Sequence, residues 1–454
     1  MPGAKSKGQS RHRIFIGLTE VAGYYRGLER GFRDIGVEAR FYDESAHSFG
    51  YGRVGFLGRL SSATEVARVA RSGATRAVTL ACLRAVRLVA HAWLFAWAVV
   101  RYDVFIFGGG DTLLRRRELP ILRRLGKRII WVFTGSDHRP PYLNGRWVRS
   151  ALENSLEPLL REMTETADRV RTAERYADVI VAAASSAQFH RQPFVHFVAI
   201  GIPAPNPQVI QASATVFQGK GVRILHCPSD PISKGTSIVR RHVDELCAAG
   251  REIDYVEMTG KPNTEVLAAL RDCDFVVDEL YSDTPMAVFA TEAGLFGKPV
   301  VVAGYYARQY ERDLGSLGEI PPTLFCEPDQ AGEAIRLMVD DASFRTELGR
   351  RAAEFVCQRW SPTQVALRYL RLIDGDIPAE WWCDPISIDY VMGWGLTEAL
   401  WHKGLRVLVG AAGVQALAEA ANPALREAIE RVAAESPEET ITATTATQIG
   451  ANPA

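Results

Sequence analysis

A Pro-rich passage that separates two series of alternating strand and helix patterns is the feature that most constrains the fold of this 454-residue chain. The passage covers residues 202–207 and contains three prolines, a composition typical of linkers between domains. A strand that is followed by a helix and a second strand favours a parallel sheet with helices on its faces. The chain is therefore predicted to fold as two doubly wound α/β domains in series.

The first series begins with an apolar strand, a turn that contains Gly17 and Gly23, and a helix that ends at Gly36. Apolar spacing and Gly or Pro stop signals define the elements. Strands are expected at 14–16, 37–42, 103–107, 128–133 and 179–182, and helices at 28–35, 119–125 and 167–176. The second series predicts strands at 222–227, 254–258, 275–277 and 299–303, and helices at 237–248, 264–271 and 287–296.

Helical patterns continue after Pro362, to about residue 372 and then at 387–400 and 405–434. The end of the chain is rich in Thr and Ala and lacks apolar periodicity, which is typical of a disordered tail. The predicted organisation is a leader at 1–12, a first domain at 13–204, a linker at 205–220, a second domain at 221–374, C-terminal helices at 375–434 and a tail at 435–454.

Charge and cysteine usage exclude several classes of protein. Lys+Arg and Asp+Glu both number 53, so no net charge favours a polyanionic partner such as nucleic acid. The seven cysteines are scattered without a CxxC pair, as in reduced thiols of the cytosol and unlike a disulfide framework or a zinc site. The basic N-terminus lacks the apolar stretch of a secretory signal. We expect a cytoplasmic protein without a metal site.

One segment, residues 78–100, is apolar enough to be mistaken for a membrane span. Arg84, Arg87 and His91 fall on one face of the expected helix, and two arginines near mid-span argue against crossing a bilayer. Two interpretations stay open at this point. The helix is either a partly buried surface helix, or a basic amphipathic helix that makes peripheral contact with a membrane.

Ligands of open α/β sheets bind at the carboxyl ends of the strands, and the first such site is the polar loop after the strand at 222–227. Lys234 and Thr236 open the helix that follows. A helix N-terminus suits a phosphate, the ammonium of Lys234 adds a charge against a diphosphate, and Ser229 and Thr236 add hydroxyl donors. The alternative is an ordinary helix start beside a solvated lysine.

The second strand exit leads into the helix expected at 287–296, which carries Glu292 among apolar residues. A lone carboxylate there needs a polar partner, and the two hydroxyls of a ribose can donate to it together. Met286 stands near the helix start, where backbone N–H groups can face an anionic donor. The alternative is a structural salt bridge for Glu292.

The third strand exit follows the strand at 128–133 and contains Asp137 and His138. Both side chains can hydrogen-bond the hydroxyls of a sugar, and either can carry the proton of an acceptor. These two residues are the predicted catalytic pair. The alternative is a turn in which Asp137 caps the following segment.

Three stretches give the chain a resemblance to the GT-B glycosyltransferases of family 4, over about residues 13–372. Residues 226–236 resemble the family's strand–loop–lysine phosphate site, and residues 291–300 resemble its donor-binding helix. The third stretch, Gly135-Ser136-Asp137 followed by Arg139, is similar to a loop common among bacterial surface-polysaccharide transferases.

The resemblance implies a GT-B fold, in which two Rossmann-like domains face a central cleft and a C-terminal helix, here within 387–400, crosses back to the first domain. It implies metal-independent, retaining transfer of a sugar from a nucleotide-diphosphate sugar, with no cofactor, to a saccharide, lipid-linked or small-molecule acceptor in polysaccharide or glycoconjugate synthesis. By this analogy Lys234 holds the diphosphate and Glu292 holds the ribose. Gly23 approaches the diphosphate or the acceptor from the first domain.

The chain departs from the family pattern at the donor loop. The family has two glutamates separated by seven residues, and counting back from Glu292 places the first at Thr284, with Asp283 beside it. The glycine-rich donor loop is replaced by residues 283–286, and the arginine that often accompanies the lysine is not evident. Two other functions therefore stay open, a non-catalytic GT-B protein that binds nucleotide sugar or regulates another transferase, and a nucleotide-sugar epimerase.

Overall fold

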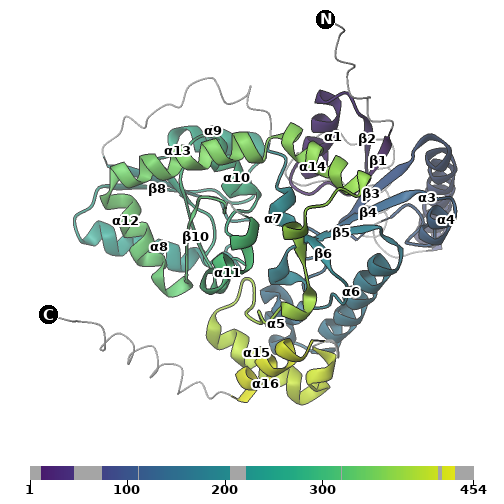
Figure 1. Ribbon diagram of the computed structural model, residues 1–454. Coiled ribbons are helices and arrows are strands. Elements are labelled where there is room, and N and C mark those ends of the chain that lie inside the picture. Colours follow the sequence, from purple (N-terminus) through teal and green to yellow (C-terminus); the bar gives the residue numbers. More distant parts are fainter. Residues whose placement is uncertain are drawn as a thin grey trace, which may run out of the picture.

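The computed structural model describes residues 12–44, 74–110, 112–204, 221–317, 320–417 and 422–434. Apart from His12, the predicted leader, linker and tail lie outside the described residues. Within the described part the chain forms two bodies, each built on its own parallel sheet with helices on both faces (Figure 1). The predicted pair of α/β domains is confirmed.

The sheet of the first domain has the strand order β12-β6-β5-β4-β3-β1-β2. All strands are parallel except β12, which pairs antiparallel with β6. Its members are β1 (Arg13–Leu18), β2 (Glu38–Asp43), β3 (Val104–Gly108), β4 (Arg128–Val132), β5 (Val179–Ala182), β6 (Phe194–His196) and β12 (Trp382–Cys383). The central strands β3 and β5 are buried along their whole length, as expected for parallel strands that are covered on both faces.

Helices surround this sheet. They are α1 (Tyr24–Asp34), α3 (Ala74–Arg101), α4 (Leu119–Arg124), α5 (Gly145–Glu153), α6 (Glu157–Tyr176) and α7 (Phe197–Ile200), with the short turns η1 (Pro141–Leu143) and η2 (Ala184–Ser186). Sequence analysis found α1, α4 and the end of α6, but it did not find α5, α7 or β6. These elements are short, and their apolar faces are too brief to show a period.

The second domain has a five-stranded sheet in the order β11-β10-β9-β7-β8. Its strands are β7 (Val222–His226), β8 (Ile253–Glu257), β9 (Phe275–Val277), β10 (Val300–Ala303) and β11 (Leu324–Cys326). Its helices and turns are α8 (Thr236–Ala248), α9 (Asn263–Asp272), α10 (Val288–Leu295), η4 (Tyr305–Arg308), α11 (Tyr310–Leu314), η5 (Gly315–Leu317), η6 (Pro328–Gln330), α12 (Ala331–Asp340) and α13 (Ala342–Arg359). Four strands and three helices were predicted within one or two residues.

The chain returns to the first domain directly after α13. Helix α14 (Pro362–Asp374) packs along α1, and the hydroxyls of Tyr24 and Tyr369 lie 2.9 Å apart. The two helices come close because Gly31 has no side chain, since a Cβ there would lie 1.9 Å from the carbonyl oxygen of Pro362. Sequence analysis placed 362–374 in the second domain, but these contacts put it on the first.

The chain does not cross back to the first domain through a helix at 387–400, as was expected. The chain passes through η7 (Ala379–Trp381), β12 and η8 (Pro385–Ser387) before it reaches α15 (Glu398–Ala412). Residues 388–397, which we name the strap, form no regular helix, so the predicted helix at 387–400 is wrong. The strap carries two glycines, Gly393 and Gly395, which are poor helix formers. After the strap, α15, η9 (Val414–Ala416) and α16 (Pro423–Ala434) pack beside α5 and η1 of the first domain (Figure 1).

These features make the architecture GT-B. Two Rossmann-like sheets are present, and the C-terminal helices cross back to the first domain. Residues that follow β1 in the first domain lie beside residues that follow β7 and β8 in the second. The carboxyl ends of strands from both sheets therefore meet in the space between the domains.

Helix α3 is exposed along much of its length. Among the described residues it is the one helix that is long and apolar enough, over Ala81–Arg101, to cross a membrane. Trp93 is 69% exposed and Val100 is 78% exposed. Arg87 and His91 instead point inward and pair with the buried carboxylate of Glu44. The helix therefore lies on the surface with apolar side chains outward, and its contact with a membrane stays a prediction.

We predict that Gly31→Ala destabilises the protein by about 1–3 kcal/mol, because the added methyl forces α14 away from α1. The measurement is the free energy of unfolding from denaturant titration. The matched control is Gly410→Ala, because Gly410 also lies in a helix but a Cβ there meets nothing within 4 Å. The control should be neutral or slightly stabilising. Equal stability of Gly31→Ala and wild type would contradict the close approach.

Candidate functional site

A cavity of about 320 Å³ lies between the two domains, and both Lys234 and Glu292 line it. We name it the Lys234 pocket. Its second-domain walls come from the loops after β7 and β8 and from the starts of α9 and α10, and Val21 and Ala22 close it from the first domain. Sequence analysis predicted that these two charged residues meet at strand ends, and the structure brings them together.

The ammonium of Lys234 is tied to two carboxylates. Its Nζ lies 2.7 Å from Oδ1 of Asp278 and 3.6 Å from Oε2 of Glu279, and both acids are buried. Burial alone lowers the pKa of Lys234, but the two carboxylates outweigh it and raise the pKa, so the lysine stays charged. The group therefore carries one positive and two negative charges.

Glu292 lies on α10 with 3% of its surface exposed. Its Oε1 accepts a hydrogen bond from Nδ2 of Asn263, at the start of α9, over 2.9 Å. Burial raises the pKa of Glu292 to about 7, opposed by the bond from Asn263. The carboxyl therefore exchanges between its neutral and charged forms near neutral pH, and the residue lines the pocket.

The loop before α8 has the geometry of a helix start. Gly235 is the N-cap residue with a φ of 70°, in the left-handed region that glycine adopts without strain. Ser229 is exposed and lines the pocket. Thr236 instead faces the interior, where its hydroxyl lies 2.9 Å from Nε2 of His226. Of the two predicted hydroxyl donors, only Ser229 lies at the pocket.

The donor-loop residues Thr284 and Met286 do not line the Lys234 pocket in the described part of the chain. The backbone N–H of Thr284 donates to the hydroxyl of Ser282, and the same hydroxyl donates to the carbonyl of Thr284. Met286 is 2% exposed and belongs to the apolar core. The backbone of Thr284 thus holds the loop conformation, and the side chain of Met286 packs in the core.

Gly23 is the N-cap residue of α1, with a φ of 86°. The helix start beside it already holds an anion, because the carboxylate of Glu20 accepts hydrogen bonds from the backbone N–H groups of Val21, Tyr25 and Arg26. A phosphate at this helix start would compete with Glu20. Gly23 thus lies next to Val21 and Ala22 of the pocket wall without being part of it.

The predicted catalytic residues lie in a separate cluster. The carboxylate of Asp137 accepts hydrogen bonds from the backbone N–H groups of Thr134 and Gly135, as a turn cap does. Burial raises the pKa of Asp137, and these bonds oppose the shift. His138 is fully buried, 3.2 Å from His190 and 3.0 Å from the hydroxyl of Ser186.

Burial, with His190 second, holds the pKa of His138 well below its ordinary value, so its ring is neutral. Neither His138 nor Asp137 lines the Lys234 pocket among the described residues. Their catalytic role stays a prediction. The contacts of both side chains support the loop after β4.

Arg139 of the same loop reaches across the cleft to the second domain. Its guanidinium donates from Nε to Oδ2 of Asp283 over 2.8 Å and lies over the ring of Trp394, 5.2 Å from the centroid. Both ionic partners are buried. Breaking such a pair leaves one charge without compensation, so this contact helps to hold the two domains together.

Sequence analysis missed Asp278, Glu279 and Asn263 as partners of the site. Asp278 and Glu279 follow β9 at the same sheet edge, which was a usable signal because strand ends converge. Asn263 gave no signal, because a polar residue at the first position of a helix is ordinary. Cys227 and Lys261 also line the pocket.

No protein-family model matches the chain, and none of the curated proteins matches it. Among solved structures, the glycotransferase of kitacinnamycin is 13% identical with a TM-score of 0.41, covering 80% of this chain and 100% of that one. Anabaena HepE in complex with UDP-glucose is 13% identical with a TM-score of 0.42, with the same two coverages. The catalytic domain of Arabidopsis starch synthase IV, bound to ADP and acarbose, is 10% identical with a TM-score of 0.45, covering 81% and 99%.

At these scores the likenesses carry no argument about ligands or residues. The GT-B assignment rests on the strand order, the paired sheets and the returning helices of this chain.

We predict a pH dependence of stability that originates at Glu292. Its pKa is raised from 4.5 in the unfolded chain to about 7 in the folded one. The folded state therefore binds more protons, and the stabilisation, on the order of 3 kcal/mol, is present below pH 4.5 and lost as pH rises through 7. Glu292→Gln should remove this loss. The measurement is the free energy of unfolding at pH 5 to 8, and parallel curves for variant and wild type would refute the assignment.

Proposed function

We propose that the protein is a glycosyltransferase that moves a sugar from a nucleotide-diphosphate sugar to an acceptor. One observation carries the proposal, namely that Lys234 and Glu292 line a single cavity which residues of both domains border. An ammonium at a helix start suits a diphosphate, and a carboxyl with a free oxygen suits a ribose hydroxyl. In a GT-B architecture such a donor would lie at the edge where both sheets end, which supports the proposal.

The rate effect would come from charge and position. Lys234 would stabilise the negative charge that develops on the leaving diphosphate, and Glu292 with Asn263 would fix the ribose. Closure by Val21 and Ala22 would exclude water from the reacting atoms. We further propose retention of configuration, independence of divalent metal, and a role in polysaccharide or glycoconjugate synthesis in the cytoplasm, as the family resemblance implies.

A second candidate function is a non-catalytic protein that binds nucleotide sugars or regulates another transferase. The observation that favours it is the pairing of Lys234 with Asp278 and Glu279. Two carboxylates against one ammonium leave a net negative charge, which opposes a diphosphate. The helix start of α1 is likewise occupied by Glu20. A transferase needs these pairs to rearrange when the donor binds.

A panel of nucleotide sugars separates the candidates. A transferase should release free nucleoside diphosphate, slowly by hydrolysis and faster when an acceptor is present. A binding protein should gain thermal stability from the nucleotide sugar without release. An epimerase should change the sugar and leave the diphosphate attached. Absence of both release and stabilisation across the panel would refute the proposed function.

We predict that Lys234→Ala lowers affinity for UDP or ADP about 10- to 100-fold, because one charge-assisted contact to the diphosphate is lost. Isothermal titration calorimetry measures the change. The matched control is Lys403→Ala, an exposed lysine on α15, which should leave affinity unchanged. Because the substitution leaves Asp278 buried without its cation, a thermal melt must show that the variant is folded. Unchanged affinity in a folded variant would remove Lys234 from the site.

We also propose that α3 rests on an anionic membrane surface, which would bring lipid-linked acceptors near the cleft. The helix contains no acidic residue over 74–101 and four arginines. Its outward face carries Trp93 and Val100. Tryptophan is favoured at the boundary of lipid and water, and arginine is attracted by anionic head groups.

Cosedimentation with phosphatidylcholine vesicles, with and without phosphatidylglycerol, tests the membrane contact. Binding should require the anionic lipid, and Trp93→Asp should abolish it, because a charge replaces the exposed indole that would enter the membrane surface. Ile232→Asp is the matched control, since Ile232 of the second domain is 70% exposed. Equal effects of the two substitutions, or equal binding to both vesicles, would exclude α3 as the contact.

A further inference from the structure

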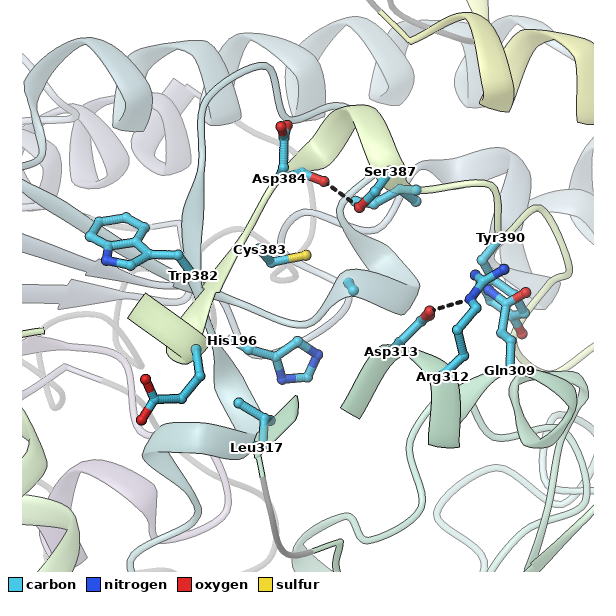
Figure 2. Close-up of a pocket in the computed structure, with 13 residues that line it drawn as sticks. His196, Gln309, Arg312, Asp313, Leu317, Trp382, Cys383, Asp384, Ser387 and Tyr390 are labelled. Carbon is cyan, nitrogen blue, oxygen red and sulfur yellow. Dashed lines mark hydrogen bonds and ion pairs between the residues drawn. The ribbon is translucent and has the colours of Figure 1, made fainter. Parts of the chain in front are cut away.

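A second cavity, of about 330 Å³, lies between the domains and shares no lining residue with the Lys234 pocket. We name it the His196 pocket. In the first domain it is bordered by the end of β6 and by β12, and in the second by α11 and the turns around it (Figure 2). Its volume falls within the range of small-molecule sites. Because both domains supply its walls, it exists only in this relative arrangement of the domains.

A buried donor without a partner points into this cavity. Nδ1 of His196 accepts a hydrogen bond from the backbone N–H of Val198 over 3.1 Å, which places the ring proton on Nε2. Nε2 has no hydrogen-bond partner among the described residues, although the residue is 5% exposed. The ring extends into the space bordered by Cys383, Leu317 and Asp313 (Figure 2).

An unpaired buried N–H group costs about 1–3 kcal/mol, and such a group in a native protein calls for an explanation. Burial lowers the pKa of His196 to about 4, so the ring at neutral pH is an uncharged donor. The group that satisfies it must therefore be a hydrogen-bond acceptor, and it need not be an anion.

The charges of the wall disfavour an anionic ligand. Arg312 is the one cation of the lining, and both Asp313 and Asp389 accept its hydrogen bonds. Glu380 and Asp384 add two further carboxylates. A second anion would meet net negative charge, whereas carboxylates readily accept hydrogen bonds from hydroxyl groups.

Aromatic and apolar groups complete the lining. The buried ring of Tyr390, which belongs to the strap, lines the cavity, whereas the indole of Trp382 lies on the opposite side of β12 from Cys383 and His196 (Figure 2). The hydroxyl of Tyr390 also lacks a hydrogen-bond partner among the described residues. Aromatic rings pack against the C–H faces of sugar rings, because both surfaces are apolar. One ligand class thus combines an acceptor oxygen, several hydroxyl donors and apolar faces.

We propose that the His196 pocket binds an uncharged saccharide, with Nε2 of His196 donating to a ring or hydroxyl oxygen and with Glu380 accepting from a hydroxyl group. This site is separate from the Lys234 pocket, and it holds its ligand whether or not the protein transfers sugars. Because the ligand contacts both domains, it also stabilises their closed arrangement.

The strap connects the His196 pocket with the loop that carries Lys234. Ile388 and Tyr390 line the His196 pocket, and Gly395 approaches Ser233, the residue before Lys234, so closely that a Cβ would lie 2.9 Å from the Cβ of Ser233. The backbone N–H of Gly395 donates to the carbonyl of Tyr281. A saccharide that orders the strap therefore acts on the loop that carries Lys234.

Saturation-transfer NMR titrations with glucose, glucosamine and glucuronate at pH 7 test the proposal on the full chain. Glucose should bind, and glucuronate should bind at least about tenfold more weakly because its carboxylate meets the acidic wall. His196→Asn keeps an acceptor for the N–H of Val198 but removes Nε2. It should weaken glucose binding about three- to tenfold.

A second variant does not depend on a buried position. Glu380→Ala, at an exposed carboxylate of the lining, should also weaken glucose binding, and Glu333→Ala, at an exposed carboxylate on α12, is the matched control that should not. Excess UDP should leave the glucose signal in place, since the two cavities share no residue. Displacement by UDP, preferential binding of glucuronate, glucosamine binding that ignores His196→Asn, or no sugar binding at millimolar concentration would each overturn the proposal. Failure of nucleotide-sugar turnover would contradict the proposed function but would not overturn this proposal.

Discussion

The relative position of the two domains depends on one close approach, that of α14 to α1. The chain leaves the second domain after α13 and returns over the first, and Gly31 permits the contact because no side chain stands between the helix and the carbonyl of Pro362. The same crossing supplies β12 to the edge of the first sheet and leads into the strap. Both interdomain cavities exist because this return holds the carboxyl ends of the two sheets toward each other.

Charged groups in the cleft are paired with one another. Arg139 holds Asp283 across the domains, Lys234 holds Asp278 and Glu279, and the start of α1 is capped by Glu20. Buried pairs of this kind fix geometry more than they add stability. Because of these pairs, an anionic ligand must displace an internal carboxylate. This displacement is the physical difference between catalysis and simple binding.

The two cavities differ in the chemical groups that line them, and therefore in the ligands they favour. The Lys234 pocket has an ammonium, a carboxyl that titrates near neutral pH and a wall from the first domain. The His196 pocket has a neutral donor and an acidic wall. The strap lines the His196 pocket and approaches Ser233, the residue before Lys234. In the proposed arrangement, a neutral ligand that binds in the His196 pocket would change the conformation of the loop that carries Lys234.

The sequence by itself determined the two α/β series, most of their strands, and the meeting of Lys234 and Glu292, because the ends of parallel strands converge at one edge of a sheet. It did not determine the short elements β6, β11 and β12, which lack a period, or the strap, where glycines override a helical pattern. Only the tertiary structure decided that Lys234 pairs with Asp278, that Asp137 caps its own turn and that Nε2 of His196 has no hydrogen-bond partner among the described residues. These outcomes depend on which distant segments lie beside each side chain, and local spacing along the chain does not encode that.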